Sequence, residues 1–163
     1  MHLTRNWNAY YVSVFLLVFW QAAAAQDQTA ARSMKLPESQ VIRASAYDFN
    51  DTVEILAAAI EEENLMLIKE IDAQKMLKMV DKKVGGMKQL LFFHPRYMKR
   101  IIETNPLGSI EPPLKLAIME RPDKKVIIKY IKPTHLFSQY QGLESIGEEL
   151  EEVVHKISLA VQQ

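Results

Sequence analysis

The chain has 163 residues, 48% hydrophobic and 25% charged, which is the composition of one globular domain and not of a disordered protein. The absence of cysteine excludes disulfides, thiolate metal sites, iron–sulfur clusters, cysteine nucleophiles and covalently attached haem. The 20 Lys and Arg residues balance 20 Asp and Glu residues, so no long-range charge attracts nucleic acid. We therefore expect no nucleic-acid partner.

Residues 1–25 are predicted to be a cleavable secretory signal peptide. Arg5 makes the start weakly basic, residues 12–20 form an apolar run, and residues 22–25 are all alanine. A signal-peptide core has about 7–15 apolar residues, whereas a membrane-spanning helix needs about 20. The pattern favours cleavage after Ala25 and export to the periplasm or the exterior, with no membrane anchor left. An uncleaved anchor is the alternative.

The rest of the chain alternates strand and helix patterns. Residues 26–39 are small and polar and are expected to form a linker, so a single globular domain should span residues 40–163. The expected elements, in chain order, are a strand at 40–47, a helix at 51–63, a strand at 65–71, a short helix from Asp72, a strand at 89–93, a helix from Pro95 to before Asn105, strands at 114–120 and 126–131, a short helix around Leu136 and a long C-terminal helix.

Three features of this order predict the fold. Residues 121–124 read Arg-Pro-Asp-Lys, a turn sequence, so the strands on either side should form a hairpin. The strand at 89–93 is largely apolar, which is typical of the inside of a sheet. The C-terminal helix has apolar residues on one face and glutamates on the other. We predict an α/β (α+β) two-layer sandwich, with a mixed sheet of about five strands and packed helices.

Several short motifs in this order resemble the bacterial and archaeal "domain of unknown function 302" family. They are Ile71-Asp72-Ala73-Gln74, Leu91-Phe92-Phe93-His94-Pro95, Thr104-Asn105-Pro106 and Pro113-Leu114-Lys115-Leu116. The last has Pro-Leu where the family pattern has Leu-Pro, a minor departure. The resemblance covers nearly the whole mature domain and implies a compact α/β fold, frequently dimeric, with no established catalytic activity.

His94 is the foremost candidate for a functional side chain. It follows the apolar strand and precedes a helix that begins with Pro95. The positive end of a helix disfavours the imidazolium ion, and a neutral imidazole is the form that binds a metal or haem iron. A strand's carboxyl end is also where open α/β sheets bind ligands. The alternative is a histidine that makes only local hydrogen bonds where strand and helix meet.

Three further residues are candidates for a cofactor or ligand pocket around His94. Met98 lies four residues further on and so on the same side of the helix, and Tyr97 and Tyr130 could add polar tips to an apolar pocket. Seven of the eight methionines follow the signal peptide. They could line a pocket or a dimer seam, although ordinary core packing is the favoured interpretation.

The leading functional hypothesis is an exported, non-enzymatic domain that binds a small apolar ligand or a partner and forms a homodimer, its physiological role unknown. It depends on the signal peptide and on the absence of serine-hydrolase, zinc-protease and phosphate-loop motifs. The alternative is a b-type haem protein with His94 as axial ligand, in electron transfer or diatomic-gas binding. A weaker third hypothesis is an enzyme with His94 as general base, assisted by Tyr97 or Tyr130.

Overall fold

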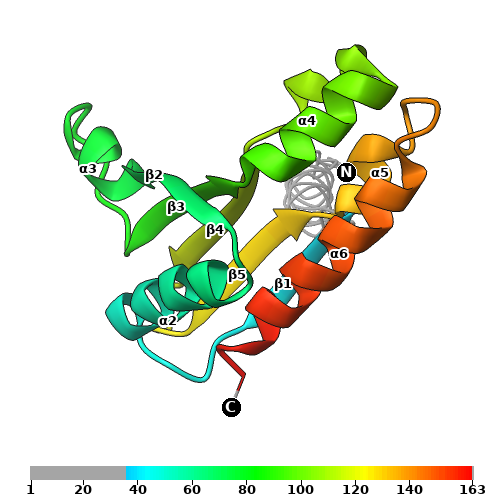
Figure 1. The fold of residues 1–163 in the computed structure, drawn as a ribbon. Helices are drawn as coiled ribbons and strands as arrows, with labels where there is room; N and C mark the ends of the chain where they lie inside the picture. The colour runs from blue at the N-terminus through cyan, green and yellow to red at the C-terminus, as the bar shows by residue number, and fades with distance from the viewer. Residues whose placement is uncertain (1–35, 163) are drawn as a thin grey trace, which may run out of the picture. The chain divides into compact units, whose positions relative to one another are not determined.

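A computed structural model describes residues 36–162, so the predicted signal peptide and most of the predicted linker lie outside the described residues. The helices and strands, shown in Figure 1, are β1 (Gln40–Ala44), α2 (Phe49–Glu62), β2 (Met66–Asp72), α3 (Ala73–Lys78), β3 (Met87–Phe93), α4 (Pro95–Thr104), the 3-10 helix η1 (Pro106–Ile110), β4 (Leu114–Glu120), β5 (Val126–Ile131), α5 (Pro133–Phe137) and α6 (Glu144–Leu159). Apart from η1, which the sequence does not predict, this is the predicted order.

The five strands form one sheet in the order β1-β5-β4-β3-β2. All four pairings are antiparallel, which corrects the expected mixed sheet. The physical reason is that β2, β3, β4 and β5 are neighbours in the sheet as well as in sequence. Their connections, including α3 and α4, turn the chain back beside itself, whereas a parallel pair needs a crossover. The crossover helix, α2, instead joins β1 at one edge to β2 at the other.

The local sequence explains where the helices begin. Asp48 caps α2, because its side chain accepts a hydrogen bond from the backbone N–H of Asp51 at 3.0 Å. The helix therefore starts at Phe49, two residues before the expected start. Asp72 caps α3 in the same way, through the N–H of Lys75 at 2.8 Å.

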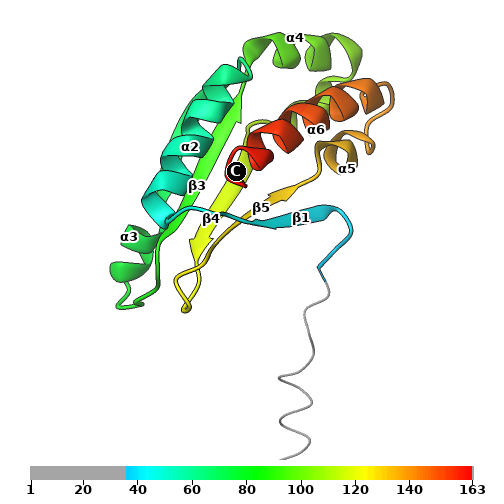
Figure 2. The ribbon, with the colours of Figure 1, turned by 90° about the horizontal axis from the view of Figure 1, so that it is seen from below.

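The hydrophobic core lies between one face of the sheet and the helices α2 and α6. Leu90, Leu116, Ile118 and Ile128 from the three interior strands are fully buried there. Figure 2 shows the helices gathered on this side of the sheet, and no helix within residues 36–162 covers the other face. The result is the predicted two-layer sandwich, with one sheet face open.

Candidate functional site

The strands β4 and β5 separate at the open end of their hairpin. Residues Ala117–Glu120 pair with Val126–Lys129, and the register does not continue to the start of β4 or the end of β5. Figure 2 shows the two strands spreading apart from their turn, with β5 following β1. The sheet is therefore interrupted there, between two strands that a regular hairpin would join.

A cavity of about 400 Å³ fills this interruption. Its apolar walls come from β3, β4, β5, α5, α6 and the segment before β4, and they comprise Phe92, Pro113, Leu114, Ala117, Ile131, Pro133, Leu136 and Val154. Its polar lining residues are Gln40, Gln89, Glu111, Lys115, Lys129 and Tyr130. A mostly apolar cavity with a few polar groups is the usual form of a small-molecule site.

The polar groups of the cavity differ in how well they are paired. Glu111 accepts a hydrogen bond from the hydroxyl of Tyr140 at 2.6 Å, which raises the pKa of Tyr140. The Oε1 atom of Gln40 is buried and has no hydrogen-bond partner among the described residues. An unpaired buried amide oxygen is unfavourable, so Gln40 is a position where a bound molecule would complete the hydrogen bonding.

Of the four candidate residues that the sequence suggests, Tyr130 lines this cavity. The other three, His94, Tyr97 and Met98, do not. Its side chain is 5% exposed, and β5 places it opposite Val41 of β1. The structure therefore does not assemble the four candidates into a single pocket. Their roles in binding a cofactor stay predictions.

His94 is the N-cap of α4. Its Nδ1 atom accepts a hydrogen bond from the backbone N–H of Arg96 at 3.1 Å, so the proton of a neutral ring is on Nε2. Binding iron through Nε2 would move that proton to Nδ1, which faces the N–H donor. This geometry favours the local hydrogen-bonding role that the sequence left open. No group of three metal-ligating side chains occurs among residues 36–162.

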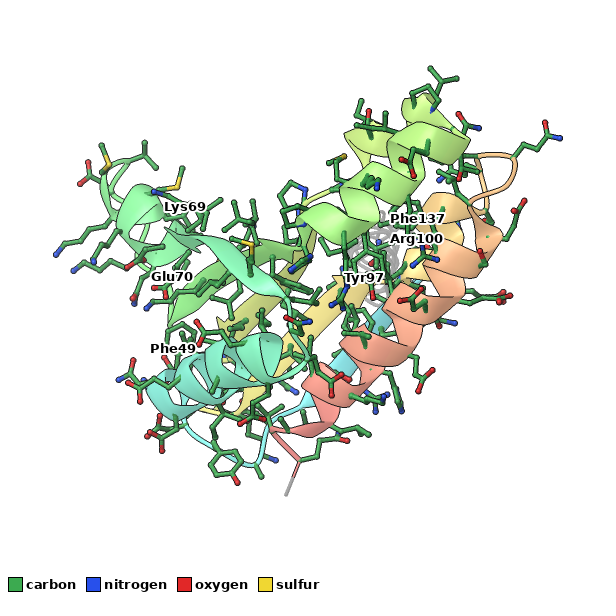
Figure 3. All side chains as sticks on the ribbon, in the orientation of Figure 1. Phe49, Lys69, Glu70, Tyr97, Arg100 and Phe137 are labelled. Carbon is green, nitrogen blue, oxygen red and sulfur yellow. The ribbon has the colours of Figure 1, made fainter. Side chains whose placement is uncertain are left out.

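Tyr97 connects α4 to α6 and is almost fully buried. Its hydroxyl donates to Glu149 Oε1 at 2.9 Å, and Arg100 contacts the other carboxylate oxygen at 2.6 Å. Figure 3 shows Tyr97 and Arg100 between these two helices. Burial raises the pKa of Tyr97, and Arg100 lowers the pKa of Glu149. The cluster is paired within the fold, which is what a helix-to-helix contact requires.

The burial of the methionines contradicts the interpretation that they pack in the core. None of the six within the described residues is buried, although core packing was the favoured role. Met76 and Met79 are 60% and 84% exposed around α3, and Met98 only packs against the margin of the core. Met66 is also exposed, whereas Met87, Met98 and Met119 are half-buried, so none of these flexible side chains lies inside the core.

Sequence reasoning missed Gln40, Gln89, Lys115 and Lys129. A signal was present in β4 and β5, where the alternation of apolar residues places Lys115 and Lys129 on the face away from the core. Gln40 and Gln89 had no such signal, because Arg43 in β1 and Lys88 in β3 are polar residues on the core side.

The described residues include no helix long and apolar enough to cross a membrane.

The fold is similar to that of an uncharacterized conserved DUF302 protein from Bacillus stearothermophilus, known from a crystal structure. The TM-score is 0.71 and the sequence identity 18%, over 77% of this chain and 99% of that chain. At this identity the likeness shows the fold alone. A comparison with curated proteins gives no match. A family model described as "Domain of unknown function DUF302" matches residues 41–163, and the chain therefore belongs to that family.

Proposed function

We propose that the mature domain is an exported, non-enzymatic protein that binds a small, largely apolar ligand in the cavity between β4 and β5. The cavity itself carries the proposal. Its volume of about 400 Å³ falls within the roughly 300–1,000 Å³ of typical ligand sites, and its walls are mostly apolar.

The lining residues support binding rather than catalysis. They include no histidine, serine, threonine or aspartate, and the one carboxylate, Glu111, is hydrogen-bonded to Tyr140. General acid–base or nucleophilic catalysis needs a positioned pair of such groups. No hydrogen bond or ion pair among the described residues joins Glu111, Lys115, Lys129 and Tyr130 to one another, so no acid–base pair is assembled and recognition is favoured.

Mass spectrometry under non-denaturing conditions tests this proposal on protein purified from the exported fraction. We expect a bound small molecule that denaturation releases. Ala117→Trp places an indole in the cavity and should abolish retention of the molecule. Ala44→Trp is the matched control, because Ala44 occupies an exposed strand position outside the cavity. Retention by the Ala117 variant, or an empty wild-type protein that binds nothing from an extract, would overturn the proposal.

Export is supported by the apolar run and the four alanines of residues 12–25. N-terminal sequencing of the exported protein should begin at Gln26. A mature protein that keeps residues 1–25 and sediments with membranes would contradict this part of the proposal.

We propose a homodimer as the assembly, through an apolar patch formed by Ile102, Leu107 and Ile110. These side chains, on α4 and η1, are 52%, 75% and 78% exposed. Exposed apolar side chains grouped in this way mark contact surfaces. A second exposed apolar group, at α3, has four lysines between residues 75 and 83 and would repel a second copy of itself.

Light scattering coupled to size exclusion tests the dimer. The double substitution Leu107→Ser and Ile110→Ser should give a monomer, while Met79→Ser, at the exposed C-cap of α3, should leave a dimer. A wild-type monomer, or a dimer that only Met79→Ser dissociates, would refute this surface.

The b-type haem alternative has no support from the cavity, which His94 does not line. A visible spectrum distinguishes it from the main proposal. A Soret band that disappears in His94→Ala would favour haem, and protein that stays colourless after haemin is added would exclude it.

A further inference from the structure

The charged side chains on the open face of the sheet are all positive. The strand registers align Ile42, Lys129, Ala117, Gln89 and Ile71 in one row across all five strands. Because partners in register share a face, this row identifies the open face, and residues two positions away along each strand lie on it too.

Three lysines lie on this face, Lys69, Lys115 and Lys129, and the described strands place no acidic residue there. The acidic residues Glu70 and Asp72 of β2 alternate to the opposite side, where Glu70 pairs with Lys88. The remaining strand positions of the open face are apolar or glutamine. The face therefore combines apolar surface with positive charge only.

Lys115 and Lys129 both line the cavity, and neither forms an ion pair among the described residues. Lys129 is half-buried, as expected of a lysine whose alkyl stem packs on a sheet while its ammonium group stays in water. Two like charges beside one apolar cavity repel each other, and the one carboxylate there, Glu111, is engaged by Tyr140. A bound anion would relieve the repulsion.

Gln40 supplies a third recognition group at the same cavity. Its buried Oε1 atom lacks a partner among the described residues, and an amide can present either its oxygen or its NH₂ group by a half-turn. With the NH₂ group turned inward, Gln40 donates to an anionic oxygen beside the two ammonium groups.

We infer that the ligand is an amphipathic organic acid, whose apolar body enters the cavity and whose anionic head is held by Lys115, Lys129 and Gln40. This inference rests on the proposed binding function, to which it adds the class of ligand. The apolar body contacts Leu114, Leu136 and Val154, and the head stays at the mouth on the open face.

Two fluorescent probes that differ only in charge test the inference. Anilinonaphthalene sulfonate carries an anionic head on an apolar body, and N-phenylnaphthylamine has the same body without the charge. We expect the wild-type domain to bind the anionic probe about tenfold more tightly or better, as hydrogen bonds to charged groups provide. Lys115→Gln with Lys129→Gln should remove that preference and leave the neutral probe unaffected.

Lys125→Gln is the matched control, because Lys125 is exposed at the turn between β4 and β5 and lines no part of the cavity. It should keep the wild-type preference, and circular dichroism should show that every variant is folded. If the wild-type domain binds both probes equally, and Ala117→Trp abolishes the binding of both, the inference of an anionic ligand is overturned. The proposed binding function is then left intact. Failure of both probes to bind, or indifference of both to Ala117→Trp, would overturn the binding function as well.

Discussion

Gly147, in the first turn of α6, gives the sharpest stability prediction. A Cβ atom at this position would lie 3.1 Å from Phe137 Cβ and 3.2 Å from the carbonyl oxygen of Pro133 and from Thr134 Cα. All three neighbours belong to α5. Two are backbone atoms, and the third is bonded directly to the backbone, so no flexible side chain can simply rotate away.

Two opposing effects decide whether Gly147→Ala raises or lowers the free energy of unfolding. Alanine gains about 1 kcal/mol of helix propensity over glycine. Inserting a methyl group into a tight contact costs about 1–3 kcal/mol. α5 cannot easily yield, because the backbone N–H of Thr134 donates to Glu151 of α6 at 3.2 Å and the Thr134 hydroxyl donates to the same carboxylate. We expect the clash to prevail, with a net loss of about 1 kcal/mol.

Urea unfolding followed by circular dichroism measures this difference. Ser145→Ala, an exposed position on the same helix, is the control and should change the free energy of unfolding by less than about 0.5 kcal/mol. Since Pro133 and Leu136 of α5 form a wall of the cavity, Gly147→Ala should also weaken probe binding. A variant as stable as the wild type, or more stable, would refute the reasoning that α5 is held rigidly on α6.

Three other predictions concern α4 and its contact with α6. His94→Ala should lower the free energy of unfolding by about 0.5–1 kcal/mol and His94→Asn, a better cap, should restore it in urea unfolding; equal stability of both variants would contradict the capping role. Tyr97→Phe removes the hydroxyl bond to the half-exposed Glu149 and should cost about 1 kcal/mol by the same assay, whereas no change would show that the bond is negligible. The pKa of Glu149 is lowered, chiefly by Arg100, so its stabilisation is present above about pH 4.5, the usual pKa, and is lost as the pH falls through the lower folded-state pKa. Glu149→Gln should flatten that part of a stability–pH profile, and an unchanged acid slope would count against the pair.

The sequence predicts single elements well because their signals are local. Periodicity identifies the helix that became α6, and the Arg-Pro-Asp-Lys turn identifies the hairpin of β4 and β5. The partner of β1 has no such signal. Its pairing with β5 brings Gln40 beside Ile131 and depends on which distant strands meet, which one strand's periodicity does not encode. The role of Gly147 was missed for the same reason, since it depends on the approach of α5.

The position of the cavity nonetheless has a cause in the sequence. Pro113 stands directly before β4, and Pro133 follows β5 after one residue, so both lie at the open end of the same hairpin. A continued register would place these two prolines opposite each other, and proline has no N–H to donate to a ladder of hydrogen bonds. Both residues line the cavity. The ladder between β4 and β5 already ends at Ala117 and Lys129, where β5 follows its other partner, β1, away from β4, and the prolines beyond that point offer no N–H that would join the two strands again. The prolines thus bound the far end of the site, whereas its charge comes from the two lysines that the hairpin's alternation places on the open face.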